Sequence, residues 1–264
     1  MKRSPRNHQE RPHERRRGRK PATGENGPVW IWGTHASAAT LANPNRVIHQ
    51  VLATENAAHR MGLSEVETVS IKALDQALPG GAVHQGIAVQ ADPLEPLGLD
   101  ELIAQRPALV AVLDQVADPH NLGAIFRSAA AFGVAGLVLQ NRHAPSVTGI
   151  VGKSAAGAIE TVAEVRVVNI ARSLDALSAG GFTVTGLAGG GSVPLETACA
   201  EASPVALVLG AEGTGLRPAV AKACDRLAHI PILAAMESLN VSNAAAIAFY
   251  EAARVNRTGP FSPE

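Results

Sequence analysis

Three small polar residues with alternate spacing stand near the end of the chain: Ser238, Asn240 and Ser242. An alanine-rich amphipathic run, 244–250, follows them directly and is typical of a helix. Ser and Asn satisfy free backbone N–H groups at a helix start, and a single residue is enough for that purpose. Two hydrogen-bonding side chains are therefore in surplus. They are either extra polar side chains at a helix start or side chains that contact a ligand.

A second motif runs from Asn121 to Arg127 and follows the pair Asp118-Pro119, which is a cap and first-turn signal for a helix. At about 100° per residue, Arg127 points about 140° away from Leu122, which lies on the apolar face of that helix. A guanidinium near a helix start can bind a phosphate group with two hydrogen bonds. The alternative is an ordinary solvated arginine.

The third motif is a glycine-rich turn after an apolar run, Gly210-Ala211-Glu212-Gly213-Thr214-Gly215. Glycine permits positive φ and a close approach of backbone to a ligand. The order of the glycines differs from the dinucleotide fingerprint, and the lysine of a phosphate-binding loop is missing. An ordinary tight turn with an exposed Glu212 is the alternative.

Apolar runs alternate with helical patterns from Ala108 onward, which predicts an α/β fold with a mostly parallel sheet flanked by helices. Predicted strands are 108–113, 136–139, 165–168, 182–187, 205–209 and 227–232, and predicted helices are 118–132, 149–159, 170–177 and a last one after Ser238. All three motifs follow predicted strands. Because open α/β sheets bind ligands beyond the carboxyl ends of their strands, we expect the motifs at one edge of the sheet.

A smaller α/β unit is predicted before this sheet. It contains strands near 29–32, 47–52 and 86–90, a helix over 36–41 capped by Thr34, and a helix over 55–61. The expected division is a disordered basic tail (1–27), a small domain (28–92), a linker (93–107), a main domain (108–258) and a C-terminal tail (259–264).

The net charge of zero conceals an asymmetry, because residues 1–20 contain nine Lys or Arg against two Glu. The remaining chain has 14 basic and 21 acidic residues. A basic arm of this kind is attracted to nucleic acid, or serves as a solubilising tail. Cys199 and Cys224 lack metal-ligand spacing and predict reduced thiols in a cytoplasmic protein, and the scattered histidines predict no metal site. No apolar run is long enough for a membrane span.

With these motifs in view, the chain resembles the SpoU (TrmH) family of RNA ribose 2′-O-methyltransferases, within the SPOUT class. The resemblance rests on Asn121-x-Gly-x-x-x-Arg127, Gly210-x-Glu-Gly-x-Gly215 and Ser238-Leu-Asn-Val-Ser242, in that order. It implies a trefoil-knotted sheet, a homodimer, S-adenosylmethionine as cofactor and no metal. Residues 28–92 resemble the family's L30e/L7Ae-like RNA substrate-binding domain.

The same resemblance implies roles for the motif residues. The cofactor would be held by Gly210, Ile230 and Leu239, with Asn240 close by. The implied catalytic residues are Asn121, Arg127, Glu212, Ser238 and Asn240. Arg127 would clamp the phosphate of the target nucleotide, oriented by Asn121 and Glu212. Ser238 would accept or relay a proton, and Ser242 is then left as the cap of the last helix.

The resemblance favours a guanosine of 23S rRNA as the methylated nucleotide. A ribose of tRNA, or a different rRNA ribose, is the alternative within the same chemistry. A non-catalytic RNA-binding or ribosome-assembly protein with the same fold is the alternative of another class.

Overall fold

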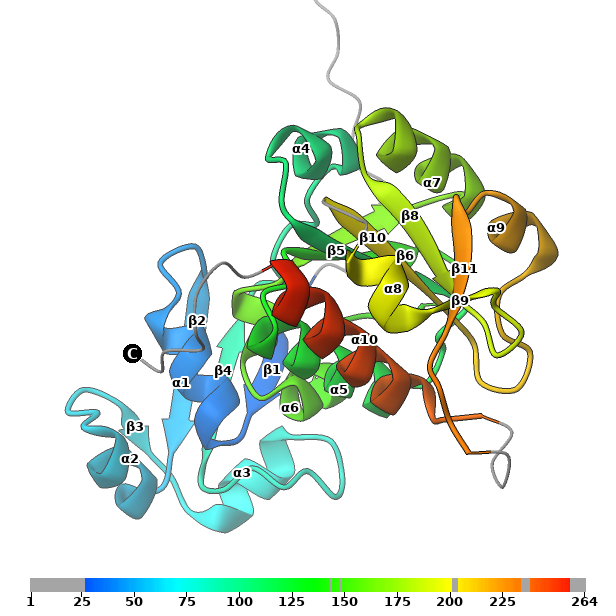
Figure 1. Ribbon diagram of the computed structural model, residues 1–264. Helices are drawn as coiled ribbons and strands as arrows, with labels where there is room; N and C mark the ends of the chain where they lie inside the picture. Colours follow the sequence, from blue (N-terminus) through cyan, green and yellow to red (C-terminus); the bar gives the residue numbers. More distant parts are fainter. Residues whose placement is uncertain (1–26, 143, 148, 201–203, 234–237, 257–264) are drawn as a thin grey trace, which may run out of the picture.

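The computed structural model describes residues 27–142, 144–147, 149–200, 204–233 and 238–256 of the chain. It contains two sheets, one of four strands and one of seven, each with its own helices (Figure 1). The tail expected at 1–27 lies outside the described residues except for Gly27, and the tail expected at 259–264 lies outside them entirely.

The smaller sheet has the strand order β1-β4-β2-β3. Its strands are β1 (Val29–Trp32), β2 (Ile48–Ala53), β3 (Glu67–Thr68) and β4 (Ile87–Ala91). The helices of this unit are α1 (Thr34–Ala42), α2 (Glu55–Met61) and α3 (Ile71–Ala77). Strand β4 runs antiparallel to β1 and β2, whereas β3 is parallel to β2.

The sequence predicted most of this unit. Helix α2 has the predicted bounds because Thr54 caps it, accepting a hydrogen bond from the backbone N–H of Ala57, and Gly62 ends it in the left-handed region. Helix α1 begins at Thr34 itself, so Thr34 is its first residue and not its cap. Helix α3, whose cap is Ser70, was not predicted.

The larger sheet has the order β7-β6-β5-β10-β8-β11-β9, and every neighbouring pair in it is parallel. Its strands are β5 (Leu109–Asp114), β6 (Gly136–Gln140), β7 (Ala163–Val167), β8 (Thr183–Leu187), β9 (Val193–Pro194), β10 (Val205–Gly210) and β11 (Arg226–His229). Its helices are α4 (Leu99–Ala104), α5 (Pro119–Ala131), α6 (Gly149–Ala155), α7 (Ile170–Ala179), α8 (Leu195–Ala200), α9 (Pro218–Lys222) and α10 (Val241–Asn256), with a 3-10 turn η1 (Ala158–Glu160).

Helices cover both faces of this sheet, so the larger unit has three layers (Figure 1). Helices α5, α6, α8 and α10 share one apolar cluster with one face of the strands, and α4, α7 and α9 share another with the opposite face. Strand β5 lies between them and is buried along its whole length, as its continuous apolar run predicted. The predicted α/β fold with a mostly parallel sheet is confirmed.

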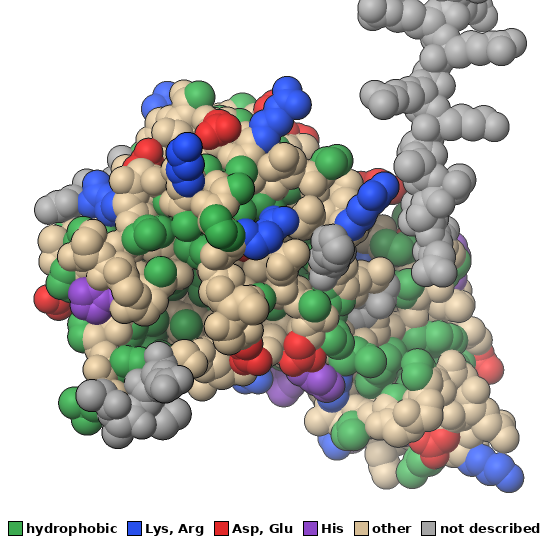
Figure 2. Space-filling model, turned by 90° about the vertical axis from the view of Figure 1, so that its right-hand side faces the viewer, with side chains coloured by type: hydrophobic (Ala, Val, Ile, Leu, Met, Phe, Trp, Pro, Cys, Tyr) green, Lys and Arg blue, Asp and Glu red, His purple; other side chains and the backbone are tan. Residues whose placement is uncertain are grey.

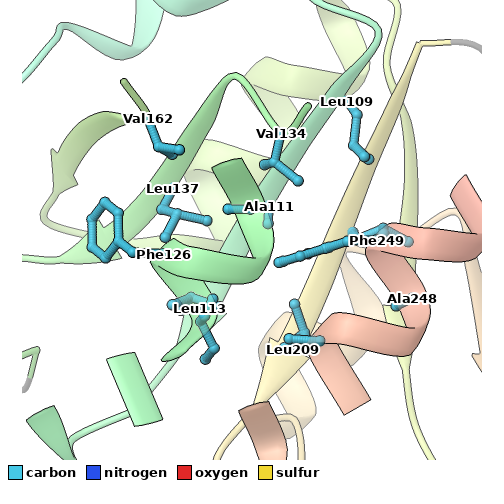
Figure 3. Close-up of a cluster of buried hydrophobic side chains, with 14 of the residues drawn as sticks. Leu109, Ala111, Leu113, Phe126, Val134, Leu137, Val162, Leu209, Ala248 and Phe249 are labelled. Atoms are coloured by element: carbon cyan, nitrogen blue, oxygen red, sulfur yellow. The ribbon is translucent and has the colours of Figure 1, made fainter. Parts of the chain in front are cut away.

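Small and aromatic residues together fill the space under α10. Ala245, Ala248 and Ala252 are fully buried, which lets the helix axis approach its neighbours closely. Phe249 points from α10 into the cluster that also holds Phe126 of α5 and Leu209 of β10 (Figure 3). This packing fixes α10 against the end of β10, where the third motif begins.

Several elements of the larger unit differ from the sequence prediction. The helix predicted over 149–159 ends at Ala155, and strand β9 was not predicted. The expected linker contains α4, whose Leu102 is fully buried in the core of the larger unit. Helices α8 and α9 were not predicted, and β11 ends at His229 instead of Ile232.

Cys199 and Cys224 are free thiols, and burial raises their pKa values to about 11 and about 12.

A buried ionic cluster joins the two units. Glu160 of η1 accepts hydrogen bonds from Thr40, Asn43 and Arg46 of the smaller unit. The Arg46 Nε to Glu160 Oε2 distance is 2.9 Å, and both side chains are only 3% exposed. Nearby, Lys153 of α6 donates to the Gln85 side chain, and burial lowers the pKa of its ammonium group.

The described residues include no helix long and apolar enough to cross a membrane.

Candidate active site

A cavity of about 450 Å³ lies where four chain segments meet at the carboxyl edge of the larger sheet. Its walls come from the ends of β8 and β10, from the chain after β11, and from the start of α10. The residues predicted to hold a cofactor, Gly210, Ile230 and Leu239, all line it. Glu212 and Ser238 line it as well, whereas Asn240 does not.

The glycine-rich turn folds back tightly on the end of β10. A Cβ atom on Gly210 would lie 2.2 Å from the carbonyl carbon of Gly215, so only glycine fits there. The turn is closed by a hydrogen bond of 2.9 Å from the Gly215 N–H to the Ala211 carbonyl oxygen. Gly213 and Gly215 have φ of 76° and 67°, which favours glycine. The turn therefore presents backbone groups to the cavity without side chains in the way.

Three polar side chains from three different motifs meet beside this cavity. Asn240 donates hydrogen bonds to Asn121 Oδ1 at 3.1 Å and to Glu212 Oε1. Asn121 Nδ2 lies 3.5 Å from the same Glu212 oxygen, which also accepts from the backbone N–H of Val241 at 3.3 Å. We call Asn121, Glu212 and Asn240 the polar cluster. The sequence predicted that these motifs lie together, and the structure confirms it.

Asn240 also caps α10. Its Oδ1 accepts hydrogen bonds from the backbone N–H groups of Ser242 at 2.9 Å and Asn243 at 3.4 Å. The cap prediction for Ser242 is therefore wrong, because the helix begins at Val241 and Ser242 is already inside it. One side chain thus serves both the helix start and the polar cluster.

Arg127 lies away from the polar cluster. It is exposed on α5, six residues after Asn121, as the helical geometry predicted. No hydrogen bond or ion pair joins it to any residue of the described chain, so the predicted orientation by Asn121 and Glu212 is not found within one chain. Ser238 is exposed at the cavity, at the start of the segment that resumes after 234–237.

Asp114 and Arg217 support the glycine-rich turn, and the sequence analysis missed both. Asp114 ends β5 directly beside Gly210 in the sheet and is fully buried. Arg217 donates to Asp114 through its backbone N–H at 3.0 Å and its Nε at 2.8 Å, and to Gln140 Oε1 at 3.2 Å. The turn between Gly210 and Arg217 is therefore fastened at both ends to neighbouring strands.

The lining suits a ligand that has an apolar ring and a polar part. Leu187, Leu209, Ile230 and Leu239 supply apolar surface, and the turn supplies backbone donors and acceptors. The volume is in the range of small-molecule sites. Among the described residues, no three His, Cys, Asp or Glu side chains lie together as a metal site requires.

The fold and this site define an RNA methyltransferase of the SpoU class. The SpoU rRNA Methylase family model matches residues 108–250, and the model for RNA 2′-O ribose methyltransferase substrate binding matches residues 30–97. The chain belongs to the SpoU rRNA methylase family.

Individual relatives cover nearly the whole chain. The chain is 38% identical over 239 residues to the 23S rRNA (guanosine-2′-O-)-methyltransferase RlmB of Vibrio cholerae, which covers 85% of this chain and 96% of that protein. It is 36% identical to the RlmB of Coxiella burnetii, with 85% of this chain and 94% of that protein covered. Among solved structures, the SpoU methyltransferase AviRb of Streptomyces viridochromogenes in complex with AdoMet matches with a TM-score of 0.72 and 25% identity, covering 89% and 92% of the two chains.

Proposed function

We propose that this protein transfers a methyl group from S-adenosylmethionine to the ribose 2′ oxygen of a guanosine in 23S rRNA. The observation that carries the proposal is the polar cluster beside the cavity at the carboxyl edge of the sheet. The similarity to RlmB proteins over most of both chains supports the choice of 23S rRNA. The similarity to bacterial rRNA methyltransferases supports the cytoplasm as the place of the reaction.

The cavity described above is the site that we propose for the cofactor. Gly210, Ile230 and Leu239 would hold its adenosine end, because they offer backbone groups and apolar surface together. When bound, S-adenosylmethionine supplies an electrophilic methyl group, whose bond to sulfur breaks as its bond to the 2′ oxygen forms. The AdoMet complex of the similar AviRb structure supports this assignment.

The remaining roles fall to exposed and clustered side chains. Arg127 would clamp the phosphate of the target nucleotide and stabilise negative charge that develops on the 2′ oxygen. Arg127 is exposed on α5 and makes no hydrogen bond or ion pair with the described residues, which supports a role toward a molecule other than its own chain. Ser238 would take the proton of the 2′ hydroxyl on Oγ while its own hydroxyl proton passes to water. The polar cluster would fix the glycine-rich turn and the start of α10 in position around the reacting atoms.

We further propose the topology and assembly that the family resemblance implies. The chain after β11 returns to the glycine-rich turn, as a trefoil knot requires, and the smaller unit would have the L30e/L7Ae-like fold. A homodimer is supported by Ile247 and Tyr250, exposed at 41% and 46% on α10. Light scattering should then give twice the mass of one chain, and a single-chain mass would contradict the dimer.

Mapping of ribose methylation tests the substrate. Comparison of all rRNA and tRNA between a wild-type and a deletion strain should show loss of one 2′-O-methylguanosine in 23S rRNA. If the 23S methylation pattern is unchanged and a tRNA methylation is lost, the substrate is tRNA and not 23S rRNA. Calorimetry that shows no binding of S-adenosylmethionine would favour a non-catalytic RNA-binding protein.

Arg217→Met should weaken binding of S-adenosylmethionine about tenfold and lower the free energy of unfolding by about 3 kcal/mol. Its physical reason is the buried Asp114 carboxylate, which would lose its charged partner. Calorimetry and thermal unfolding measure the two effects. Arg172→Met, at an exposed position of α7, is the matched control and should change neither. Equal cofactor affinities in the two variants would contradict the role of Arg217 in the turn.

Removal of residues 1–27 should weaken binding to a 23S rRNA fragment and flatten the salt dependence of that binding. Each phosphate that a basic side chain neutralises releases counterions, so fewer basic residues give a smaller slope. On the face shown in Figure 2, the described Lys and Arg side chains are scattered and form no continuous basic track. Filter binding at several salt concentrations measures the slope. Equal slopes for both proteins would leave the arm as a solubilising tail.

A further inference from the structure

A second cavity, of about 440 Å³, lies between the two units of the chain. Trp30, Trp32 and Pro79 line it from the smaller unit, and Pro119, Pro145 and Ile150 line it from the larger one. None of the described residues around it is charged. We refer to it as the interdomain cavity. It is separate from the cavity at the glycine-rich turn and shares no lining residue with the proposed cofactor site.

The aromatic content of this cavity is unusual for this chain. The whole sequence has two tryptophans, and both line the interdomain cavity. Trp32 is 5% exposed and belongs to the core of the smaller unit, whereas Trp30 is only partly buried. Flat aromatic rings are the surfaces on which proteins stack the unpaired bases of RNA. An uncharged aromatic cavity therefore suits a base better than a phosphate.

The walls of the cavity are held firmly. A Cβ atom on Gly149 would lie 2.4 Å from two ring carbons of Trp32, so α6 lies directly against the indole. The buried Arg46–Glu160 ion pair also joins the same two units. The cavity is therefore a fixed feature of the domain arrangement, and a ligand would meet it ready-formed.

The position of the cavity relates it to the proposed reaction. Pro119, in its wall, is the first residue of α5, and Asn121 of the polar cluster follows two residues later. A separation of two residues places them about 200° apart around the helix, so about one helix diameter, ~10 Å, lies between cavity and cluster. The basic arm also joins the described chain at Gly27, two residues before Val29 in the cavity wall.

We propose that the interdomain cavity binds an unpaired base of the RNA substrate, close in sequence to the methylated nucleotide, with Trp30 as the stacking surface. The proposal rests on the proposed function, since it takes the ligand to be the RNA that is methylated. The described body of the chain has few basic residues to hold RNA by charge, so a stacked base would supply affinity and position together. Its geometry would set which nucleotide reaches the polar cluster.

Two substitutions of Trp30 separate stacking from simple filling of space. Trp30→Leu keeps an apolar side chain but removes the aromatic face, and should raise the KM for a 23S rRNA transcript about tenfold. Trp30→Phe keeps an aromatic face and should stay within about threefold of the wild type. Ile71→Ala, at a residue 64% exposed and outside the cavity, is the control for loss of apolar surface. Unchanged affinity for S-adenosylmethionine checks that each variant is folded.

Tryptophan emission gives a second, independent measurement, because both tryptophans of the chain are in this cavity. Addition of the same transcript to the full-length wild type should quench the emission, and an oligonucleotide with an abasic site at the stacked position should not. Equal KM values for the Leu variant and the wild type, or equal rises for Leu and Phe, would overturn the proposal and leave the cavity to an apolar segment of another protein. If the wild type methylates no RNA at all, the proposed function fails instead.

Discussion

Arg127→Lys should lower the methyl-transfer rate about a hundredfold while S-adenosylmethionine binds as it does to the wild type. Lysine keeps the positive charge but cannot form the two parallel hydrogen bonds that a guanidinium makes with a phosphate. Removal of one well-placed donor to a developing oxyanion has an effect of this size. Because Arg127 lies outside the cavity proposed for the cofactor, the binding of the cofactor should not change. Single-turnover transfer of a labelled methyl group measures the rate.

The matched control is Arg172→Lys, which changes another exposed arginine, on α7, at the opposite face of the sheet. It should keep the wild-type rate. A near-normal rate for Arg127→Lys would remove the clamp from the mechanism and reduce Arg127 to a general positive charge. A loss of cofactor affinity in the same variant would show that Arg127 acts on the cavity instead of the RNA.

Glu160→Gln should lower the free energy of unfolding by about 3 to 5 kcal/mol. The substitution leaves the Arg46 guanidinium buried, at 3% exposure, without a charged partner, which is the strongly destabilising way to break a buried ion pair. A change of this size lowers the melting temperature by about 10 °C in a protein of similar length. Thermal unfolding followed by circular dichroism measures it.

The chain offers a more exposed ion pair for comparison, in which the Glu251 side chain is 16% exposed. Arg254 and Glu251 are three residues apart on α10, and the arginine side chain is 52% exposed. Glu251→Gln should change the stability by less than about 1 kcal/mol, as exposed pairs usually do. Limited proteolysis should also cut Glu160→Gln faster between the two units, near 93–107. Equal melting temperatures for the two variants would show that the Arg46–Glu160 pair does not hold the units together.

The strands of the larger sheet could be predicted from the sequence because a buried parallel strand is apolar along its whole length. Strand β5, predicted as 108–113 and observed as Leu109–Asp114, is the clearest case. The start of α5 was equally predictable, since Asp118 and Pro119 are a local cap and first-turn signal, and Asp118 does accept from two backbone N–H groups. The approximate place of the site followed from the rule that ligands bind at the carboxyl edge.

The prediction failed where tertiary contacts decide between local alternatives. Ser238, Asn240 and Ser242 are all good caps by residue type, and the choice of Asn240 depends on its hydrogen bonds to Asn121 and Glu212. Helices α8 and α9 have six and five residues, too few to show a period.

The support of the glycine-rich turn could not have been predicted from the sequence. Asp114 and Arg217 are 103 residues apart, and neither stands in a motif that indicates a partner. The interdomain cavity could not have been predicted either, because Trp30 and Ile150 are brought together only by the docking of the two units. A single sequence contains no local signal for pairs of this kind.

Glu212 is synthesised before Val241, whose backbone N–H donates a hydrogen bond to it. The last wall of the cavity proposed for the cofactor, which consists of Ser238, Leu239, Val241 and Ala244, is made after every other part of it. A nascent chain that still has its last helix inside the ribosome therefore has an open and incomplete cavity. We therefore expect that a chain still under synthesis lacks a complete cofactor site until α10 has emerged and docked.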